Sequence, residues 1–245
     1  MSGHNKWSQI KRQKQAGDVV RGKLFSRLSN TIAAAVKAGG KDPATNIRLR
    51  LILEQVKGAN MPSDSVERAI KRGAGELPGA QIEEVIYEAY GPGGVAILVE
   101  ATTDNKNRTT ADLRAVLTRF EGKLAGTGAV SYLFEKRGII TSPQVGNEIV
   151  EAAIDAGAQD FDQSEAGTIV YCDPKLVEQI KTAMTSKGFT VIEEKISWEP
   201  KSTVPLNATI AKKVLALMDA IDELEDVSNV ASNFDIPEEV AKQVS

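Results

Sequence analysis

The sequence has few of the residues from which catalytic and metal sites are built. It contains one histidine, His4, and one cysteine, Cys172. A lone histidine near the start of the chain supplies neither a histidine-based metal site nor a catalytic triad inside a folded pocket. A lone cysteine permits no internal disulfide, and its β-like surroundings (168–172) favour a small buried side chain. These residues therefore support no cofactor, no metal and no enzyme.

Long apolar runs are also missing. No stretch approaches the roughly 20 apolar residues that a membrane span needs. Residues 1–15 are polar and basic, without the apolar segment of a secretory signal. We therefore expect a cytoplasmic protein with no membrane partner. Aromatic residues make up only 5% of the chain, which argues against an RNA-binding sheet built on several stacking aromatics.

Charge is distributed unevenly along the chain. Residues 1–78 hold fifteen Lys and Arg against six Asp and Glu, a net charge of +9. The remaining residues hold fifteen against 27, a net charge of −12. An asymmetry of this size favours a nucleic-acid-binding N-terminal third, although the whole chain carries a net charge of −3.

The first 28 residues carry most of the predicted nucleic-acid contacts. Residues 1–17 show no apolar periodicity and are predicted to form an arm that is mobile in isolation. Its cations would release counterions from phosphates, and Trp7 offers a face for base stacking. The alternative is a solvated, weakly structured terminus. The predicted contacts in this region are Lys6, Trp7, Lys11, Arg12, Lys14, Arg21, Lys23 and Arg27.

Three helices are predicted after the arm. The first begins at a cap on Asp18 and stops at Gly39-Gly40, because apolar residues recur at three- and four-residue spacing between them. The second is predicted to begin at Asp42-Pro43 and to end at Gly58. The third runs from Ser63 to Gly73. Together with the arm they form a predicted basic domain, residues 1–78.

A second predicted contact lies between a β-hairpin and a helix. The hairpin spans residues 82–102, and the helix over 109–120 would be capped by Thr109 or Thr110. Lys106 and Arg108 would then stand at a helix N-terminus, which attracts anions. An ordinary polar loop is an equally good interpretation. The glycine-rich stretch 122–128 follows a helix and precedes a strand, the wrong order for a dinucleotide fingerprint, so an enzyme ranks last.

The remaining pattern predicts an α+β multidomain protein. From residue 130 to 198 the order of elements is β-α-β-β-α-β, which is typical of a ferredoxin-like unit. The hairpin and helix before it, and the helix and strand after it, hold too few strands to stand alone. We therefore expect a split α+β domain (79–130 plus 200–245) into which a ferredoxin-like domain (131–199) is inserted.

Several long motifs resemble the YebC/PmpR family, which includes the mitochondrial translational activator of cytochrome c oxidase. They are Gly3-His4-Asn5-Lys6-Trp7, Arg21-Gly22-Lys23-Leu24-Phe25, Tyr87-Glu88-Ala89-Tyr90-Gly91-Pro92-Gly93-Gly94, Thr103-Asp104-Asn105-Lys106-Asn107-Arg108-Thr109 and Gly128-Ala129-Val130-Ser131-Tyr132-Leu133-Phe134. The resemblance runs nearly from end to end. It implies one helical and two α+β domains, and no catalytic residue.

For function the resemblance implies two alternatives. Bacterial members are commonly described as transcriptional regulators that bind promoter DNA, and we take a DNA-binding transcriptional regulator as the first expectation. Other members act at the ribosome, where they help translation of stalling-prone, proline-rich sequences. The expected partner is therefore promoter DNA or ribosomal RNA, with the ribosome as a further partner and no small-molecule substrate.

Overall fold

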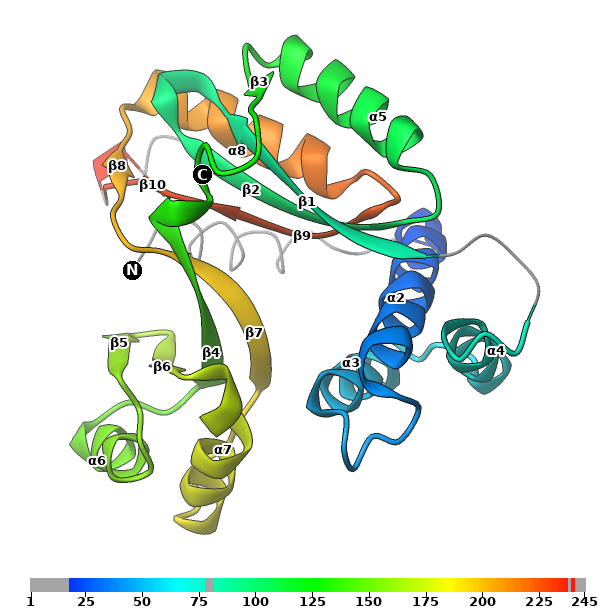
Figure 1. Ribbon diagram of the computed structural model, residues 1–245. Helices are drawn as coiled ribbons and strands as arrows, with labels where there is room; N and C mark the ends of the chain where they lie inside the picture. The colour runs from blue at the N-terminus through cyan, green and yellow to red at the C-terminus, as the bar shows by residue number, and fades with distance from the viewer. Residues whose placement is uncertain (1–17, 78–81, 238, 241–245) are drawn as a thin grey trace. The chain divides into compact units, whose positions relative to one another are not determined.

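A computed structural model describes residues 18–77, 82–237 and 239–240 (Figure 1), with side chains described from residue 22 onward. The described chain separates into two compact units. One unit is residues 134–201. The other combines the described residues up to Leu133 with those from Ser202 onward. Among the helices of these described ranges, none combines the length and the apolar composition of a membrane span.

Three helices open the larger unit, as the sequence predicts. They are α2 (Asp18–Gly39), α3 (Ile47–Gly58) and α4 (Ser63–Gly73). Their shared core is formed by Leu28, Ile32, Ala35, Val36, Leu49, Ile52, Val56, Met61 and Ala69. Helices α2 and α4 come so close at Gly73 that a Cβ there would lie 2.4 Å from the carbonyl oxygen of Ala33. Glycine is required at this crossing because any side chain would push the helices apart.

The predicted start of the second helix at Asp42-Pro43 is wrong. Helix α3 begins at Ile47, and its cap is Asn46, whose side-chain oxygen accepts from the Leu49 N–H at 3.0 Å. The Asn46 amide also donates to the carbonyls of Ala35 and Gly40. Asp42 instead closes a turn by accepting from the Ala44 N–H. Asn46 is the cap in place of Asp42 because its side chain hydrogen-bonds backbone groups of both α2 and α3.

A four-stranded sheet in the order β3-β1-β2-β9 forms the rest of the larger unit. Strands β1 (Glu83–Tyr90) and β2 (Ala96–Thr103) are the predicted hairpin, closed by the short helix η1 (Pro92–Gly94). Strand β9 (Val227–Ser232) pairs antiparallel with β2. Strand β3 (Lys123–Leu124) lies within the glycine-rich stretch 122–128 and pairs with the end of β1.

Helices α5 (Lys106–Arg119) and α8 (Ala208–Asp222) lie side by side over one face of this sheet (Figure 1). The core beneath them includes Ile97, Val99, Leu113, Leu117, Val214, Leu217, Met218, Ile221, Val230 and Phe234. Beyond the sheet, β8 (Val204–Pro205) and β10 (Phe234–Asp235) form a short parallel pair. The sheet and its helices therefore join residues from before and after the 134–201 unit.

The 134–201 unit is the predicted ferredoxin-like fold. Its sheet order is β5-β6-β4-β7 with all pairs antiparallel. Helices α6 and α7 share a core with one face of the sheet, including Ile140, Val170 and Ile180. The elements are β4 (Phe134–Ser142), α6 (Asn147–Asp155), β5 (Asp160–Ser164), β6 (Gly167–Cys172), α7 (Val177–Ser186) and β7 (Glu193–Pro200). The α+β architecture with an inserted βαββαβ unit is confirmed.

Candidate nucleic-acid interface

The predicted contacts divide into those that the structure describes and those that it does not. Arg21 is on helix α2, but its side chain is outside the described set. The side chains that can be placed are Lys23, Arg27, Lys106 and Arg108. Residues Lys6, Trp7, Lys11, Arg12 and Lys14 lie outside the described residues altogether, as does the predicted arm of residues 1–17.

Lys23 lies exposed on helix α2, beside residues that fix the helix in place. Its neighbours Leu24 and Phe25 pack against the core of the three helices. No carboxylate in the described part of the chain forms an ion pair with the Lys23 ammonium. Within the described part of the chain, the helix therefore holds this cation at a fixed place on the surface without a carboxylate partner, which is the form a phosphate contact needs.

Arg27, one turn further along α2, has its charge neutralised inside the unit. Its guanidinium lies 3.4 Å from the Asp222 carboxylate at the end of α8 and also donates to the Asp222 carbonyl. Only 21% of the Arg27 side chain is exposed. Arg27 therefore ties α2 to α8, and it has less to offer a phosphate than Lys23.

Lys57 and Arg68 resemble Lys23: both are exposed, and neither pairs with a carboxylate in the described ranges. The sequence could not separate them from the other cations of the helices, because most of the pairing depends on tertiary proximity. The only signal was the net charge of the segment. Other cations in residues 18–77 form ion pairs, among them Lys41 with Glu76, Arg48 with Glu84, and Lys71 with Glu67.

The loop that carries Lys106 and Arg108 begins helix α5 earlier than the sequence predicts. The cap is Asn105, whose side chain accepts from the N–H groups of Asn107 and Arg108 at 3.1 Å each, so the predicted cap at Thr109 or Thr110 is wrong. Lys106 lies 2.6 Å from Glu83. This ion pair raises the pKa of Lys106 and lowers the pKa of Glu83. The N–H groups of Asn107 and Arg108 and the Lys106 ammonium are therefore already bound by groups of the protein itself.

Arg108 is held by two carboxylates. Its Nη2 donates to Asp226 at 2.8 Å and to Asp104 at 2.9 Å, and these bonds raise the pKa of Arg108. Asp226 is buried and also accepts from the hydroxyls of Thr103 (3.1 Å) and Thr109 (2.7 Å). The Thr103–Thr109 motif therefore joins the end of β2, the start of α5 and the turn before β9. An ordinary structural loop describes it better than an anion site.

A second buried carboxylate, that of Glu88, is bound by the loop at the end of the glycine-rich stretch 122–128. Glu88 accepts from the N–H groups of Gly128 (2.6 Å), Val130 (2.6 Å) and Ser131 (2.9 Å). Burial alone would raise the pKa of Glu88, but these backbone hydrogen bonds outweigh it and leave the pKa below its usual value. The loop does have the N–H groups that bind an anion, and the protein supplies the anion from its own strand β1.

The titratable groups of the described residues form no cluster that points to metal chemistry. Across residues 18–77, 82–237 and 239–240, no three His, Cys, Asp or Glu side chains gather closely enough to hold a metal ion. Cys172 is fully buried, and burial raises the pKa of its thiol to about 11. That environment agrees with the prediction of a small packed side chain.

Known proteins match the chain along nearly its whole length. Residues 5–76 match the TACO1/YebC protein N-terminal domain, and residues 82–234 match the TACO1/YebC second and third domain. A protein of Aquifex aeolicus named "Probable transcriptional regulatory protein" is 48% identical over 248 residues, covering 100% of both chains. A protein of the same name from Pseudothermotoga lettingae is 47% identical, covering 96% of this chain and 94% of the relative.

The fold is matched by a solved structure as well. The crystal structure of a conserved hypothetical protein from Aquifex aeolicus superposes with a TM-score of 0.82 at 48% identity, covering 90% of this chain and 93% of that one. The chain belongs to the TACO1/YebC family.

Proposed function

We propose that the protein is a non-enzymatic, cytoplasmic regulator of gene expression that binds nucleic acid through its N-terminal third. Relatives across the full length carry the name of a probable transcriptional regulatory protein, which supports the regulatory role. The observation that carries the binding is the net charge of +9 over residues 1–78. The proposed contacts are Lys6, Trp7, Lys11, Arg12, Lys14, Arg21 and Lys23. Arg27, Lys106 and Arg108 are proposed as weaker contacts, because each already forms an ion pair within the protein.

The described cations are expected to differ in how much each contributes to nucleic-acid binding. Lys23, Lys57 and Arg68 pair with no carboxylate among the described residues, so each can meet a phosphate without first breaking an internal ion pair. Arg27 and Arg108 would have to give up Asp222 and Asp226. We therefore expect the first set to contribute more to binding than the second.

Promoter DNA is the first candidate partner, in line with the names of the relatives. Helices α3 and α4 are joined by a four-residue connection (59–62), the length found in helix-turn-helix motifs. In that arrangement α4 would be the helix that approaches the major groove. Its exposed Arg68 supplies charge for such an approach.

Ribosomal RNA is the second candidate, and the acidic residues of α4 favour it. The first turns of α4 carry Asp64 and Glu67, and Glu67 neutralises Lys71 at 2.6 Å. Carboxylates at the N-terminus of a recognition helix would approach the phosphates that flank a groove, which is unfavourable. Contacts to phosphates made mainly by the basic segment 1–28 require no such helix and suit folded RNA as well as DNA.

Salt dependence of binding tests the proposed contacts. The variant Lys11→Ala/Arg12→Ala/Lys14→Ala is expected to bind both duplex DNA and RNA more weakly. The slope of log affinity against log salt should fall by about 2 to 3, because each lost phosphate contact removes roughly 0.7 to 0.9. A control that removes the same charge elsewhere is Lys175→Ala/Lys187→Ala/Lys212→Ala, at three exposed lysines. Equal slopes for the two triple variants would show that overall charge, and not residues 11–14, governs binding.

Sequencing of the nucleic acid that crosslinks to the protein in cells separates the two partners. Enrichment of promoter fragments would support the transcriptional regulator and contradict the ribosomal alternative. Reads focused on one region of ribosomal RNA would do the reverse. A protein carrying Lys11→Ala/Arg12→Ala/Lys14→Ala is the matched control, since its yield should drop for whichever partner is the true one.

A further inference from the structure

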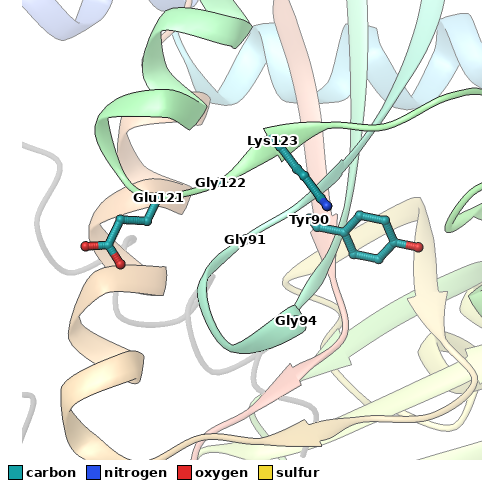
Figure 2. Close-up of a pocket in the computed structure, with 6 residues that line it drawn as sticks. All are labelled: Tyr90, Gly91, Gly94, Glu121, Gly122 and Lys123. Carbon is teal, nitrogen blue, oxygen red and sulfur yellow. The ribbon is translucent and has the colours of Figure 1, made fainter.

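A hollow on the larger unit lies between two tight turns of the chain (Figure 2). Its volume is about 500 Å³, within the range of small-molecule sites. Strand β3 brings the turns together because Lys123 pairs with Tyr90 at the end of β1. The lining residues are Tyr90, Gly91, Gly94, Glu121, Gly122 and Lys123. None of them belongs to the proposed N-terminal interface.

Much of the wall of this hollow is bare backbone. Three of the lining residues are glycines. A Cβ placed on Gly94 would meet no other group within 4 Å. Gly94 has a φ of +77°, which side-chain-bearing residues rarely adopt. At Gly122 a Cβ would lie 2.9 Å from the Tyr90 carbonyl oxygen, so the two turns touch there through backbone alone. A flat ligand can therefore approach the main chain closely.

One side of the hollow has a fixed aromatic ring. The Tyr90 hydroxyl donates to the Ala129 carbonyl at 2.9 Å, which holds the ring in one orientation. The Lys123 ammonium lies 5.9 Å from the centre of that ring, and Figure 2 shows its side chain directed toward Tyr90. An aromatic face beside a cation is the pairing that proteins use to hold a base and its phosphate.

The charge that remains in the hollow is positive. Lys123 forms no ion pair with a carboxylate in the described part of the chain. The lining carboxylate, Glu121, is neutralised by Lys213 of helix α8 at 2.7 and 2.8 Å, and it points away from Tyr90 in Figure 2. Lys123 is therefore the group at this site with capacity to bind an anion.

We infer that this hollow binds one nucleotide unit, with the base against Tyr90 and the glycine backbone and the phosphate on the Lys123 ammonium. The same chemistry is offered by a free mononucleotide and by an unpaired nucleotide of an RNA strand. A base within a duplex is stacked on both sides and does not fit the site. The inference stands apart from the proposed N-terminal contacts, because it uses no residue of that segment.

Backbone amide NMR on the full chain tests the inference. Titration with adenosine or uridine monophosphate is expected to shift the amides of Gly91, Gly94 and Gly122 if a free nucleotide is the ligand. If the ligand is a strand, a short unpaired uridine oligonucleotide shifts these amides and the monophosphates do not. An absence of shifts at all three glycines with every one of these probes would overturn the inference, as would equal shifts with a DNA duplex of the same length.

The affinity of lysine variants for whichever probe binds gives the second readout. Lys123→Ala should weaken binding about tenfold, the usual effect of losing one charge-assisted contact, and Lys123→Arg should largely restore it. The matched control is Lys175→Ala, at another exposed lysine. Equal losses for Lys123→Ala and Lys175→Ala would contradict the assignment. Lys11→Ala/Arg12→Ala/Lys14→Ala should leave these glycine shifts in place, so failure of this site and failure of the N-terminal contacts are distinguishable.

Discussion

Replacing Glu88 with glutamine probes the carboxylate that organises the loop after β3. Glu88 is 5% exposed and accepts three backbone hydrogen bonds, one on Oε1 and two on Oε2. Glutamine has nearly the same shape but offers one acceptor oxygen and one amide group. In the variant at least one backbone N–H would face the side-chain N–H₂ and lose its partner.

The expected loss follows from the number of bonds. A hydrogen bond to a charged group contributes about 1.5 to 3 kcal/mol, and a buried donor without a partner costs about 1 to 3 kcal/mol. Glutamine keeps at least one of the three bonds, so we expect Glu88→Gln to lower the free energy of unfolding by about 2 to 4 kcal/mol. The loop that includes Gly128, Val130 and Ser131 should exchange its amide hydrogens faster.

The effect should also depend on pH with a definite sign. The folded-state pKa of Glu88 lies below its usual value, so its contribution to stability is fully present above the pKa of an unfolded glutamate, about 4.3. That contribution is lost as the pH falls through the lower, folded-state pKa. The difference between the natural protein and Glu88→Gln should therefore be large at pH 7 and shrink below about pH 4.

Hydrogen exchange and urea unfolding at pH 7 and at pH 3.5 measure both effects. The matched control is Glu121→Gln, at an exposed carboxylate that pairs with Lys213 on the surface. We expect the control to change stability by less than about 1 kcal/mol, because exposed ion pairs contribute little. If Glu88→Gln matched the control in stability and in exchange of the 128–131 amides, the role assigned to Glu88 would be wrong.

Two further predictions concern helix packing and capping. Gly73→Ala should destabilise the contact of α2 with α4 by about 1 to 3 kcal/mol, since its Cβ would lie 2.4 Å from the Ala33 carbonyl oxygen. Gly58→Ala is the control, with nothing within 4 Å of the added carbon; thermal unfolding that ranked the two alike would contradict the packing argument. Asn105→Ala should cost about 1 kcal/mol by removing the cap of α5. Unchanged amide exchange at Asn107 and Arg108 would count against that cap.

Local signals in the sequence predict the elements well where the relevant partners are close along the chain. The first helix stops at glycine as predicted, and the third helix runs from Ser63 to Gly73. The βαββαβ order also follows from periodicity and turn residues. In each of these cases the deciding groups lie within a few residues of the element they define.

Prediction fails where a distant group decides. Asp42-Pro43 has the form of a helix start, but Asn46 takes over because it reaches the Ala35 and Gly40 carbonyls. Thr109 has the form of a helix cap, but its hydroxyl binds Asp226, which is 117 residues away. The spacing of these residues along the sequence does not predict that the bonded groups lie close together in the fold.

The candidate site shows the same division. The basic character of the N-terminal third is visible in composition, whereas the neutralisation of Arg27 by Asp222 and of Arg108 by Asp226 depends on the fold. For the same reason Lys23 cannot be ranked above Arg27 from the sequence. A charge count predicts that a surface binds phosphate, and the ion pairs then decide which of its cations are available.

Photocrosslinking followed by mass spectrometry of the crosslinked peptides shows whether the N-terminal third is the surface that contacts nucleic acid. The full chain would be bound to its nucleic acid at physiological salt, irradiated and digested. We expect most crosslinked peptides to come from residues 1–28, with further ones around Lys57 and Arg68. Crosslinks concentrated in the 134–201 unit, with none in residues 1–28, would contradict it.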